Sequence, residues 1–377
     1  MHGLPRFIGK RCQPRRQSAD ASCYTELCHQ EYRHKKEMSS SYPQNKVVLV
    51  GATGLVGTEI LRTLERLPLP IDFLVPMASE RSAGKEITFR NERKTVELFD
   101  PGAFRGARWV FFSGKDGLSE EFCPVAASEG AWVIDNSSVF RLKEGVPLVV
   151  PEVNMHSVGD RPGIIANPNC STIQLAVALA PIRDSLGLKR VIVSTYQSAS
   201  GAGNEYNDKL RDDASIFLSE GPDSVDADSL AFNCLPAVGS IDEDGRFGEE
   251  TKLERELKKI LDMELLPVCA TAVRVPTFVS HCESVVVETE SPVDPVDARR
   301  ILKAFPGIEI IDDPENRAFP TPRRAEATDP VWVGRIRRAR VFENDLAFWV
   351  VADNLRKGAA LNAVQIAVEL DRRTVQR

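Results

Sequence analysis

The segment "NPNCST", residues 167–172, places Cys170 directly before the apolar run "IQLAVALAPI". Free cysteines are often buried, so packing is one interpretation of this residue. Catalysis is the other, because the unpaired N–H groups and the positive dipole end at a helix start favour a thiolate. The polar residues around the cysteine favour the second interpretation. We therefore predict that Cys170 is a nucleophile, with Asn169 and nearby backbone N–H groups facing a developing oxyanion.

A nucleophilic thiol also needs a group that can take its proton. The chain has five histidines, and only His156 and His281 lie beyond the first 44 residues. His281 begins the alternating segment "HCESVVVETE", which gives its side chain a fixed direction on a strand. His281 is the candidate, although a surface or satisfied core histidine is the simpler alternative for either residue.

A second chemical motif is the glycine-rich stretch "VVLVGATGLVG", which follows an apolar strand and leads into a helix. Glycines in this context allow a tight turn, and the helix N-terminus faces a pyrophosphate, so a dinucleotide site is predicted. A βα turn without a ligand is the alternative. The expected cofactor contacts from this turn are Gly51, Thr53, Gly54, Leu55, Val56 and Gly57.

The segment "ASERSAGK" after the second strand indicates which nicotinamide cofactor is bound. Ser79, Arg81 and Ser82 are suited to a ribose 2′-phosphate, and arginine is the best fork for it. An acidic residue at this place would instead favour the ribose diol of NAD, and Glu80 leaves the strictness of the choice open. NADP(H) is the predicted cofactor.

The elements that must position these residues alternate between strands and helices from Asn45 onward. This alternation predicts an α/β fold with a Rossmann-type doubly wound parallel sheet. After Cys170 longer strands with fewer helices predict an α+β catalytic and dimerisation domain with a large mixed or antiparallel sheet. We expect a dinucleotide-binding domain at 45–168, completed by a C-terminal helix at 355–377, and a second domain at 169–354.

Composition sets the broad class of the protein. The 377 residues carry a net charge of −6, which implies no general affinity for nucleic acid or an anionic membrane, and no apolar segment is long enough to cross a bilayer. Eight scattered cysteines without a secretory signal favour reduced thiols and a cytoplasmic location. Residues 1–44 are basic and polar, so they are expected to be poorly ordered, and their Cys and His residues fit no standard metal spacing. No metal site is predicted.

Several motifs together resemble one family. They occur in that family's order and span residues 45–371; they are "GATGLVG", "ASERSAGK", "DNSSVFR", "VPEVN", "NPNCST", "YQSASGAG", "RVPTFVSH" and "DNLRKGAALNAVQIA". The family is aspartate-semialdehyde dehydrogenase, for which "NPNCST" with a downstream "RVP…H" is highly specific. The resemblance implies NADP-dependent reductive dephosphorylation of L-aspartyl-4-phosphate to aspartate 4-semialdehyde, a step in lysine, methionine and threonine synthesis.

The resemblance also implies roles for individual residues. Cys170 matches the nucleophile and His281 the acid/base of the family. The implied substrate contacts are Gln197 at the cysteine, Arg274 on the α-carboxylate, Glu249 on the ammonium, and Lys252 with Arg141 on the phosphate. Glu250 is the alternative to Glu249, and a solvated helix face is the simpler interpretation of that segment. Ser200, Gly201 and Gly203 match the nicotinamide loop, and Asn354 lies in the C-terminal motif on the cofactor side.

Two other functions are compatible with parts of this pattern. N-acetyl-γ-glutamyl-phosphate reductase shares the fold and the thioester chemistry, but its substrate has a blocked amine and would not need Glu249. A non-catalytic dinucleotide-binding paralogue would typically lack the cysteine. The expected partners are therefore a small-molecule substrate and inorganic phosphate, and the family implies a homodimer or a tetramer of dimers.

Overall fold

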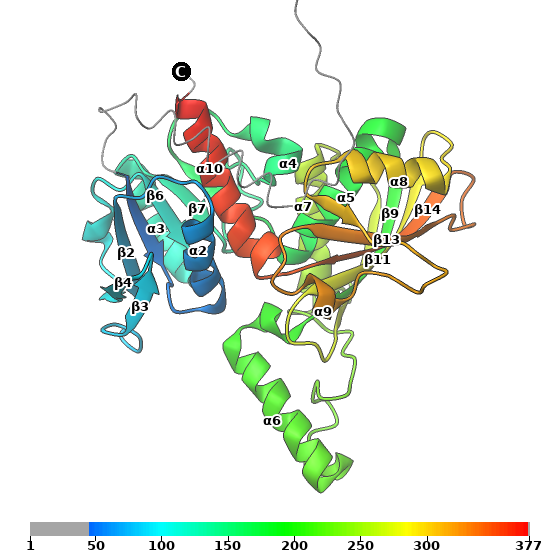
Figure 1. Ribbon diagram of the computed structural model, residues 1–377, viewed down its shortest axis with the longest axis horizontal. Helices are drawn as coiled ribbons and strands as arrows, with labels where there is room; N and C mark the ends of the chain where they lie inside the picture. Colours follow the sequence, from blue (N-terminus) through cyan, green and yellow to red (C-terminus); the bar gives the residue numbers. More distant parts are fainter. Residues whose placement is uncertain (1–44, 376–377) are drawn as a thin grey trace, which may run out of the picture. The chain divides into compact units, whose positions relative to one another are not determined.

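Within residues 45–375, which the computed structural model describes, two six-stranded sheets carry the fold (Figure 1). The predicted extension at 1–44, with its cysteines and histidines, lies outside the described residues. None of the helices in the described part is long and apolar enough to cross a membrane. The predicted combination of a doubly wound parallel sheet and a large mixed sheet is confirmed, whereas the domain boundaries stay a prediction.

The first sheet is parallel throughout and has the order β5-β2-β1-β6-β7-β8. Its strands are β1 (Lys46–Val50), β2 (Phe73–Ala78), β5 (Glu97–Leu98), β6 (Trp109–Phe112), β7 (Trp132–Asp135) and β8 (Ile164–Ala166). The apolar runs that predicted β1, β2, β6 and β7 are continuous because both faces of the sheet are covered, as is typical of parallel sheets.

Helices cover the two faces of this sheet separately. Val47 and Leu49 of β1 pack in one core cluster with residues of α2 (Leu55–Arg66) and α10 (Leu361–Val375). Val48 and Val50 point the other way, into a cluster that contains residues of α3 (Asp116–Ser128). Adjacent strand residues alternate between faces, so one apolar run can serve both cores.

The second sheet is mixed and has the order β10-β9-β11-β14-β13-β12. The β9–β10 and β12–β13 pairs are parallel, and the three central pairs are antiparallel. Its strands are β9 (Leu188–Gln197), β10 (Val268–Arg274), β11 (His281–Thr289), β12 (Ile308–Ile310), β13 (Val331–Arg337) and β14 (Asp345–Ala352). Register places Arg274 beside Gln197 at the end of the parallel pair.

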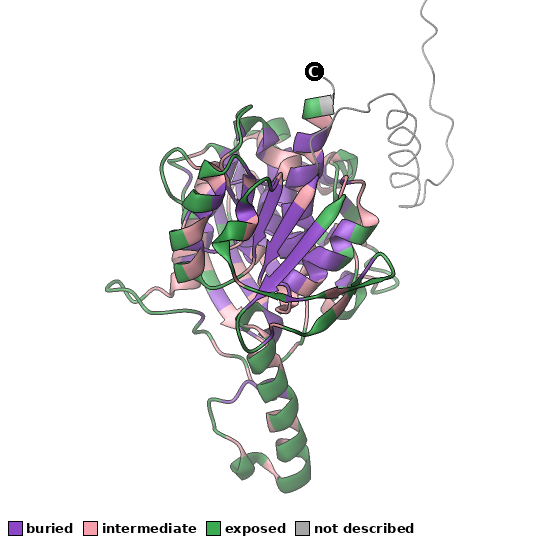
Figure 2. Cartoon of the chain, turned by 90° about the vertical axis from the view of Figure 1, so that its left-hand side faces the viewer, coloured by how far each residue is buried: buried purple, intermediate pink, exposed green. Residues whose placement is uncertain are grey.

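Helix α5 (Cys170–Leu186) connects the two sheets. All twelve residues from Ser171 to Ile182 are buried, so α5 is enclosed along most of its length. In contrast, α6 (Asn204–Glu220) buries only Leu210, and it is the mostly green helix that projects at the bottom of Figure 2. The remaining elements are β3 (Glu86–Phe89), β4 (Glu92–Thr95), α4 (Pro151–Asn154), α6 (Asn204–Glu220), α7 (Gly248–Leu261), α8 (Pro295–Ala304) and α9 (Pro322–Ala325), with short 3₁₀ turns at Pro101–Phe104, Met155–Ser157, Ala199–Ala202 and Pro222–Ser224 and a π-helical turn at Arg356–Ala360.

Candidate active site

The two predicted motifs meet at one edge of the first sheet. The glycine turn follows β1 directly, and three residues separate the end of β8 from Cys170 at the start of α5. The carboxyl ends of parallel strands lie at the same sheet edge, where α/β proteins bind their ligands. The glycine turn and the Cys170 segment, which are far apart in the chain, therefore lie at the same edge of the sheet.

The glycine turn has the geometry that a dinucleotide requires. Gly51 has φ +85°, and a Cβ built on Gly57 would lie 2.1 Å from the Gly51 carbonyl oxygen. A side chain at either position would distort the turn. Gly54, the N-cap of α2, offers no side-chain cap, so the first-turn N–H groups of α2 have no side-chain acceptor at the cap and suit an anion.

The predicted 2′-phosphate residues form a tight turn beyond β2. The Ser82 N–H donates to the Ser79 carbonyl at 2.9 Å, and Lys85 Nζ donates to Ser82 Oγ at 3.4 Å. Arg81 Nη1 lies 3.5 Å from Glu205 Oε1, with both side chains more than four-fifths exposed. Such a solvated ion pair contributes little, so Arg81 is available to a phosphate. Lys85 is a cation that the sequence interpretation did not select.

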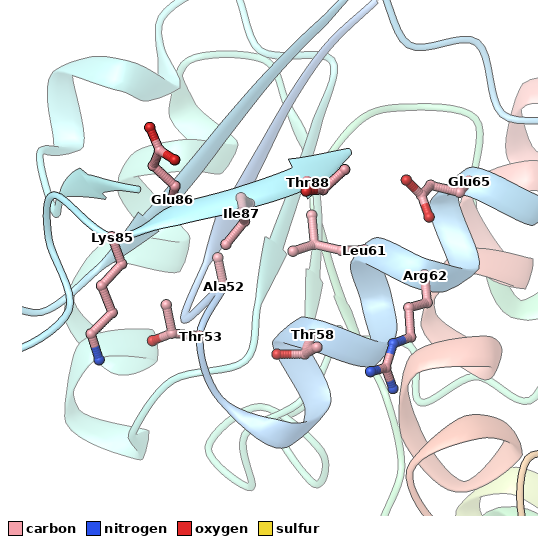
Figure 3. Close-up of a pocket in the computed structure, with 10 residues that line it drawn as sticks. All are labelled: Ala52, Thr53, Thr58, Leu61, Arg62, Glu65, Lys85, Glu86, Ile87 and Thr88. Atoms are coloured by element: carbon pink, nitrogen blue, oxygen red, sulfur yellow. The ribbon is translucent and has the colours of Figure 1, made fainter. Parts of the chain in front are cut away.

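A pocket of about 390 Å³ lies between α2 and β3, beside this turn (Figure 3). Thr53 and Lys85 stand at one end, and Arg62 and Glu65 stand at the other. Neither Cys170 nor His281 lines it. This pocket therefore belongs to the dinucleotide side of the sheet edge and is separate from the thiol.

Cys170 is the first residue of α5, and it is partly exposed. The side chain of Asn169 caps the helix, with its Oδ1 accepting from the N–H groups of Ser171 at 2.9 Å and Thr172 at 3.4 Å. A Cβ built on Gly358, in the π-helical turn, would lie 3.0 Å from Cys170 Cβ. The thiol is thus held between a capped helix start and a backbone that approaches closely because residue 358 is a glycine.

The acidity of Cys170 differs from the expectation. Desolvation raises the pKa of the thiol to about 12, with the Glu249 carboxylate adding to the rise and the Arg141 and Arg274 guanidinium groups opposing it. These groups favour the protonated thiol in the ligand-free site, whereas the sequence pattern favoured the thiolate. The helix dipole favours a thiolate, but the loss of water around the sulfur and a nearby carboxylate outweigh it.

This arrangement predicts how the thiol reacts with iodoacetamide. Alkylation of Cys170 should rise about tenfold per pH unit from pH 7 to 9 without a plateau, because the thiolate fraction grows in this way below the pKa. Glu249→Gln should make alkylation faster at pH 8, since one source of the raised pKa is removed. Peptide-resolved mass spectrometry measures the rate at Cys170 alone.

Glu250→Gln is the matched control for that experiment, because Glu250 is the neighbouring carboxylate and is not among the groups that shift the Cys170 pKa. It should leave the alkylation rate unchanged. If the alkylation rate of the unmodified chain instead levelled off near pH 7, the raised pKa would be contradicted, and the dipole of α5 would be the dominant effect on the thiol.

His281 is fully buried at the start of β11, and its tautomer is set by Ser198. The Ser198 backbone N–H, which can only donate, lies 3.1 Å from Nδ1. Nδ1 is therefore the acceptor and the proton is on Nε2, which has no hydrogen-bond partner among the described residues. Burial, together with Arg274, lowers the pKa of His281 to about 3, so the ring is neutral at physiological pH. The site thus contains a neutral imidazole with a free N–H donor.

Arg274 and the predicted nicotinamide loop lie against this imidazole. A Cβ built on Gly201 would be 2.8 Å from Arg274 Nη1 and 3.2 Å from His281 Nε2. Arg274 Nη1 also donates to the Ser198 carbonyl at 2.8 Å. The backbone at Gly201 therefore approaches the guanidinium and the imidazole so closely that any side chain there would clash with Arg274 and crowd His281.

Asn354 ties this loop to the strand that carries His281. Its Oδ1 accepts from the Ser280 N–H at 2.8 Å and from the hydroxyls of Ser198 and Ser200 at 3.2 and 3.1 Å. Through these contacts Asn354 binds both the loop that contains Ser198 and Ser200 and the residue that precedes β11. Its predicted role toward the cofactor stays a prediction, and its observed role is to fix Ser198 and thereby the orientation of His281.

Of the two adjacent glutamates, Glu249 faces the site. Its Oε1 accepts from Asn169 Nδ2 at 2.7 Å and from Gln197 Nε2 at 3.4 Å, and Lys252 Nζ lies 3.8 Å from its Oε2. Glu250 instead accepts from the backbone N–H groups of Phe247 and Ala272, both at 2.9 Å. Glu250 therefore caps α7 and ties it to β10, and Glu249 is the glutamate whose carboxylate lies beside Asn169 and Gln197.

Arg141 completes the cluster from the loop after β7. Its Nη2 donates to the Asn136 carbonyl at 2.9 Å, its Nη1 donates to Glu256 Oε1 at 3.1 Å, and its Nε has no partner among the described residues. Every residue predicted to touch the substrate thus borders one site. Sequence interpretation missed Glu256, Ser198 and Gly358. Ser198 and Gly358 lie inside two of the motifs that carry the family resemblance, and Glu256 lies seven residues after Glu249 and so on the same helix face.

The fold and the site define a class of protein that comparison with known families confirms. Residues 46–160 match the family model "Semialdehyde dehydrogenase, NAD binding domain", and residues 179–357 match "Semialdehyde dehydrogenase, dimerisation domain". Together these two matches span most of the described chain. The chain is thus an NAD(P)-binding oxidoreductase of the semialdehyde dehydrogenase class.

Individual relatives narrow this class. The chain is 49% identical to the aspartate-semialdehyde dehydrogenase of Aquifex aeolicus, over 85% of this chain and 96% of the relative. A crystal structure of aspartate semialdehyde dehydrogenase II complexed with ASA from Vibrio cholerae is 41% identical, with a TM-score of 0.83 over 88% of this chain and 99% of that chain. A structure with NADP from Candida albicans is 25% identical, with a TM-score of 0.70 over 88% and 99%. The chain belongs to the aspartate-semialdehyde dehydrogenase family.

Proposed function

We propose that the protein catalyses the NADP-dependent reductive dephosphorylation of L-aspartyl-4-phosphate to L-aspartate 4-semialdehyde through a thioester on Cys170. The observation that carries the proposal is the placement of Glu249, Arg141 and Arg274 around the thiol of Cys170. One anionic and two cationic side chains match a substrate that bears an ammonium, a carboxylate and a phosphate.

Each charged side chain is assigned a substrate group by its chemistry. Arg274 suits the α-carboxylate, because a guanidinium binds a planar carboxylate with two hydrogen bonds. Glu249 receives the ammonium, and pairing with it removes part of the charge that raises the Cys170 pKa. Arg141, through its unpartnered Nε, and Lys252 at the rim hold the phosphate.

The covalent chemistry takes place on Cys170. The sulfur attacks the acyl carbon, the bond from that carbon to the phosphate oxygen breaks, and phosphate leaves with the thiol proton. Since Nδ1 of His281 already accepts a hydrogen bond, His281 contributes through its Nε2–H, which donates to the acyl oxygen as negative charge develops there. Once the thioester carbon has accepted a hydride, the resulting thiohemiacetal collapses: its oxygen re-forms the C=O double bond, the carbon–sulfur bond breaks with its electron pair on sulfur, and the aldehyde is released.

The nicotinamide cofactor supplies the hydride that reduces the thioester. The residues present fit such a group, because the glycine turn admits close backbone approach and the start of α2 lacks a side-chain acceptor at its cap. Arg81 and Ser82, with Lys85 beside them, favour NADP over NAD. The NADP-bound relative from Candida albicans supports this preference.

The proposed biological setting follows from the family. The family name of the relatives supports the activity, and from that activity we infer a role in lysine, methionine and threonine synthesis; a cytoplasmic location is part of the same proposal. The match of residues 179–357 to a dimerisation domain supports a homodimer or a tetramer of dimers.

The decisive experiment runs the reaction in the oxidative direction. Purified protein should reduce NADP in the presence of both aspartate 4-semialdehyde and phosphate, and N-acetylglutamate semialdehyde should react at least about 100-fold less efficiently, because Glu249 has no ammonium to bind. Absorbance of the reduced nicotinamide measures both rates. Equal rates, or a preference for the acetylated aldehyde, would reject the proposal in favour of the glutamyl enzyme.

A further inference from the structure

Glu256 is a buried carboxylate that joins two parts of the site. Its side chain is 2% exposed; Oε1 accepts from Arg141 Nη1 at 3.1 Å, and Oε2 accepts from the Asn169 backbone N–H at 2.7 Å. Asn169 is the cap of the helix that begins with Cys170. One side chain therefore connects the guanidinium assigned to phosphate with the backbone that sets the position of the sulfur.

The helix that carries Glu256 is organised around this connection. Glu249, Lys252, Glu256 and Lys259 lie three or four residues apart and so occupy one face of α7. Lys259 Nζ donates to the carbonyls of Arg141 and Val146, both at 2.8 Å, and of Lys143 at 3.2 Å. Glu256 thus holds the side chain of Arg141, while Lys259 holds the loop from which that side chain extends.

Stability alone is a weak explanation for such a residue. Removing a carboxylate and a guanidinium from water is costly, and well-packed apolar residues in place of a buried ion pair are often at least as stabilising. Burial raises the pKa of Glu256, and Arg141 and the Asn169 N–H act in the opposite direction. The buried pair of Glu256 and Arg141 is better explained by positioning, because it keeps the guanidinium at a fixed distance from the backbone of Asn169.

We propose that Glu256 is a positioning residue, which fixes Arg141 relative to the backbone of Asn169 and thereby places the phosphate of the acyl phosphate opposite the sulfur of Cys170. This inference rests on the proposed function. It concerns only the steps in which the bond between the acyl carbon and phosphate breaks or forms. Hydride transfer does not involve Arg141 and should be insensitive to Glu256.

The two kinds of step can be measured separately in the oxidative direction. Without phosphate, aspartate 4-semialdehyde and NADP should give a burst of one NADPH per site, because the thioester forms but is not released. With phosphate, turnover continues. In Glu256→Gln, the amide oxygen can still accept from the Asn169 N–H, but the negative charge beside Arg141 is lost. We expect the phosphate KM to rise about tenfold or more, since a charge-assisted hydrogen bond is lost, and the burst rate to stay within about twofold.

Glu250→Gln is the matched control, because Glu250 is also a buried carboxylate of α7 that accepts two hydrogen bonds but does not touch Arg141. Its phosphate KM should not change. An unchanged phosphate KM in Glu256→Gln, or an equal fall in burst and turnover, would overturn the positioning role. Should Glu256→Gln fail to fold, Glu256→Asp decides: the charge is kept but the reach is shortened, so the phosphate KM must again rise without loss of the burst. An unmodified chain without any burst would instead overturn the proposed function, and the inference with it.

Discussion

Replacing Cys170 by alanine is expected to lower turnover by more than about 10⁴-fold, the scale on which loss of a covalent nucleophile acts. Cys170 is the thiol beside Glu249, Arg141 and Arg274, so the substitution removes the sulfur from the site that those residues form. NADP binding should be nearly unchanged, because the glycine turn follows β1 whereas Cys170 begins α5. Steady-state kinetics and a fluorescence titration of the cofactor measure the two quantities.

Cys269→Ala provides the control for this prediction. Cys269 is an exposed thiol on β10 and should tolerate the change with full activity. Retained turnover in Cys170→Ala would remove the thioester from the mechanism. A loss of cofactor binding together with turnover would mean that the variant had disturbed the sheet edge as a whole.

The second large effect is expected at His281, where alanine should lower kcat by about 10²–10³-fold, as for the removal of one oxyanion donor. The physical reason is the fixed tautomer, with Nδ1 accepting from Ser198 and Nε2–H free. A glutamine amide can place an N–H near the position of Nε2, so His281→Gln should recover about tenfold of the loss.

The comparison of the two His281 variants distinguishes a donor from a base. An amide cannot take up a proton, so a catalytic base would leave glutamine as inactive as alanine. Since the His281 pKa is lowered to about 3, kcat should also show no fall caused by its protonation between pH 5 and 8. A kcat that titrates with a pKa of 6–7 and is abolished equally in both variants would contradict the donor role.

The strands and the chemistry-bearing loops were predictable because their signals are local. Continuous apolar runs predicted the parallel strands, and the glycine spacing predicted the turn at Gly51 and Gly57, since both depend on residues that are neighbours in the chain. The start of α5 was predicted for the same reason: Asn169 caps the helix through N–H groups only two and three residues away. The short π-helical turn at Arg356–Ala360 has no local sequence pattern that predicts it. The sequence therefore predicted one continuous C-terminal helix.

The protonation states were decided by tertiary structure. The Cys170 pKa was expected to be low from the helix start alone, but burial and Glu249 from α7 reverse the direction. Likewise, the tautomer of His281 depends on Ser198, which is 83 residues away in the chain. Desolvation and charge–charge interactions act through space, so the local pattern around a residue does not contain them.

From the amino-acid order alone came the identity of the reacting groups, namely a thiol at a helix start, an imidazole beginning a strand and a glycine turn for a dinucleotide. Folding decided which of two adjacent glutamates faces the thiol, and it brought in Glu256, whose partners are 115 and 87 residues away. Residue types and short spacings encode chemistry and local geometry, whereas orientation, water exclusion and long-range ion pairs exist only once the two sheets and α5 have packed together.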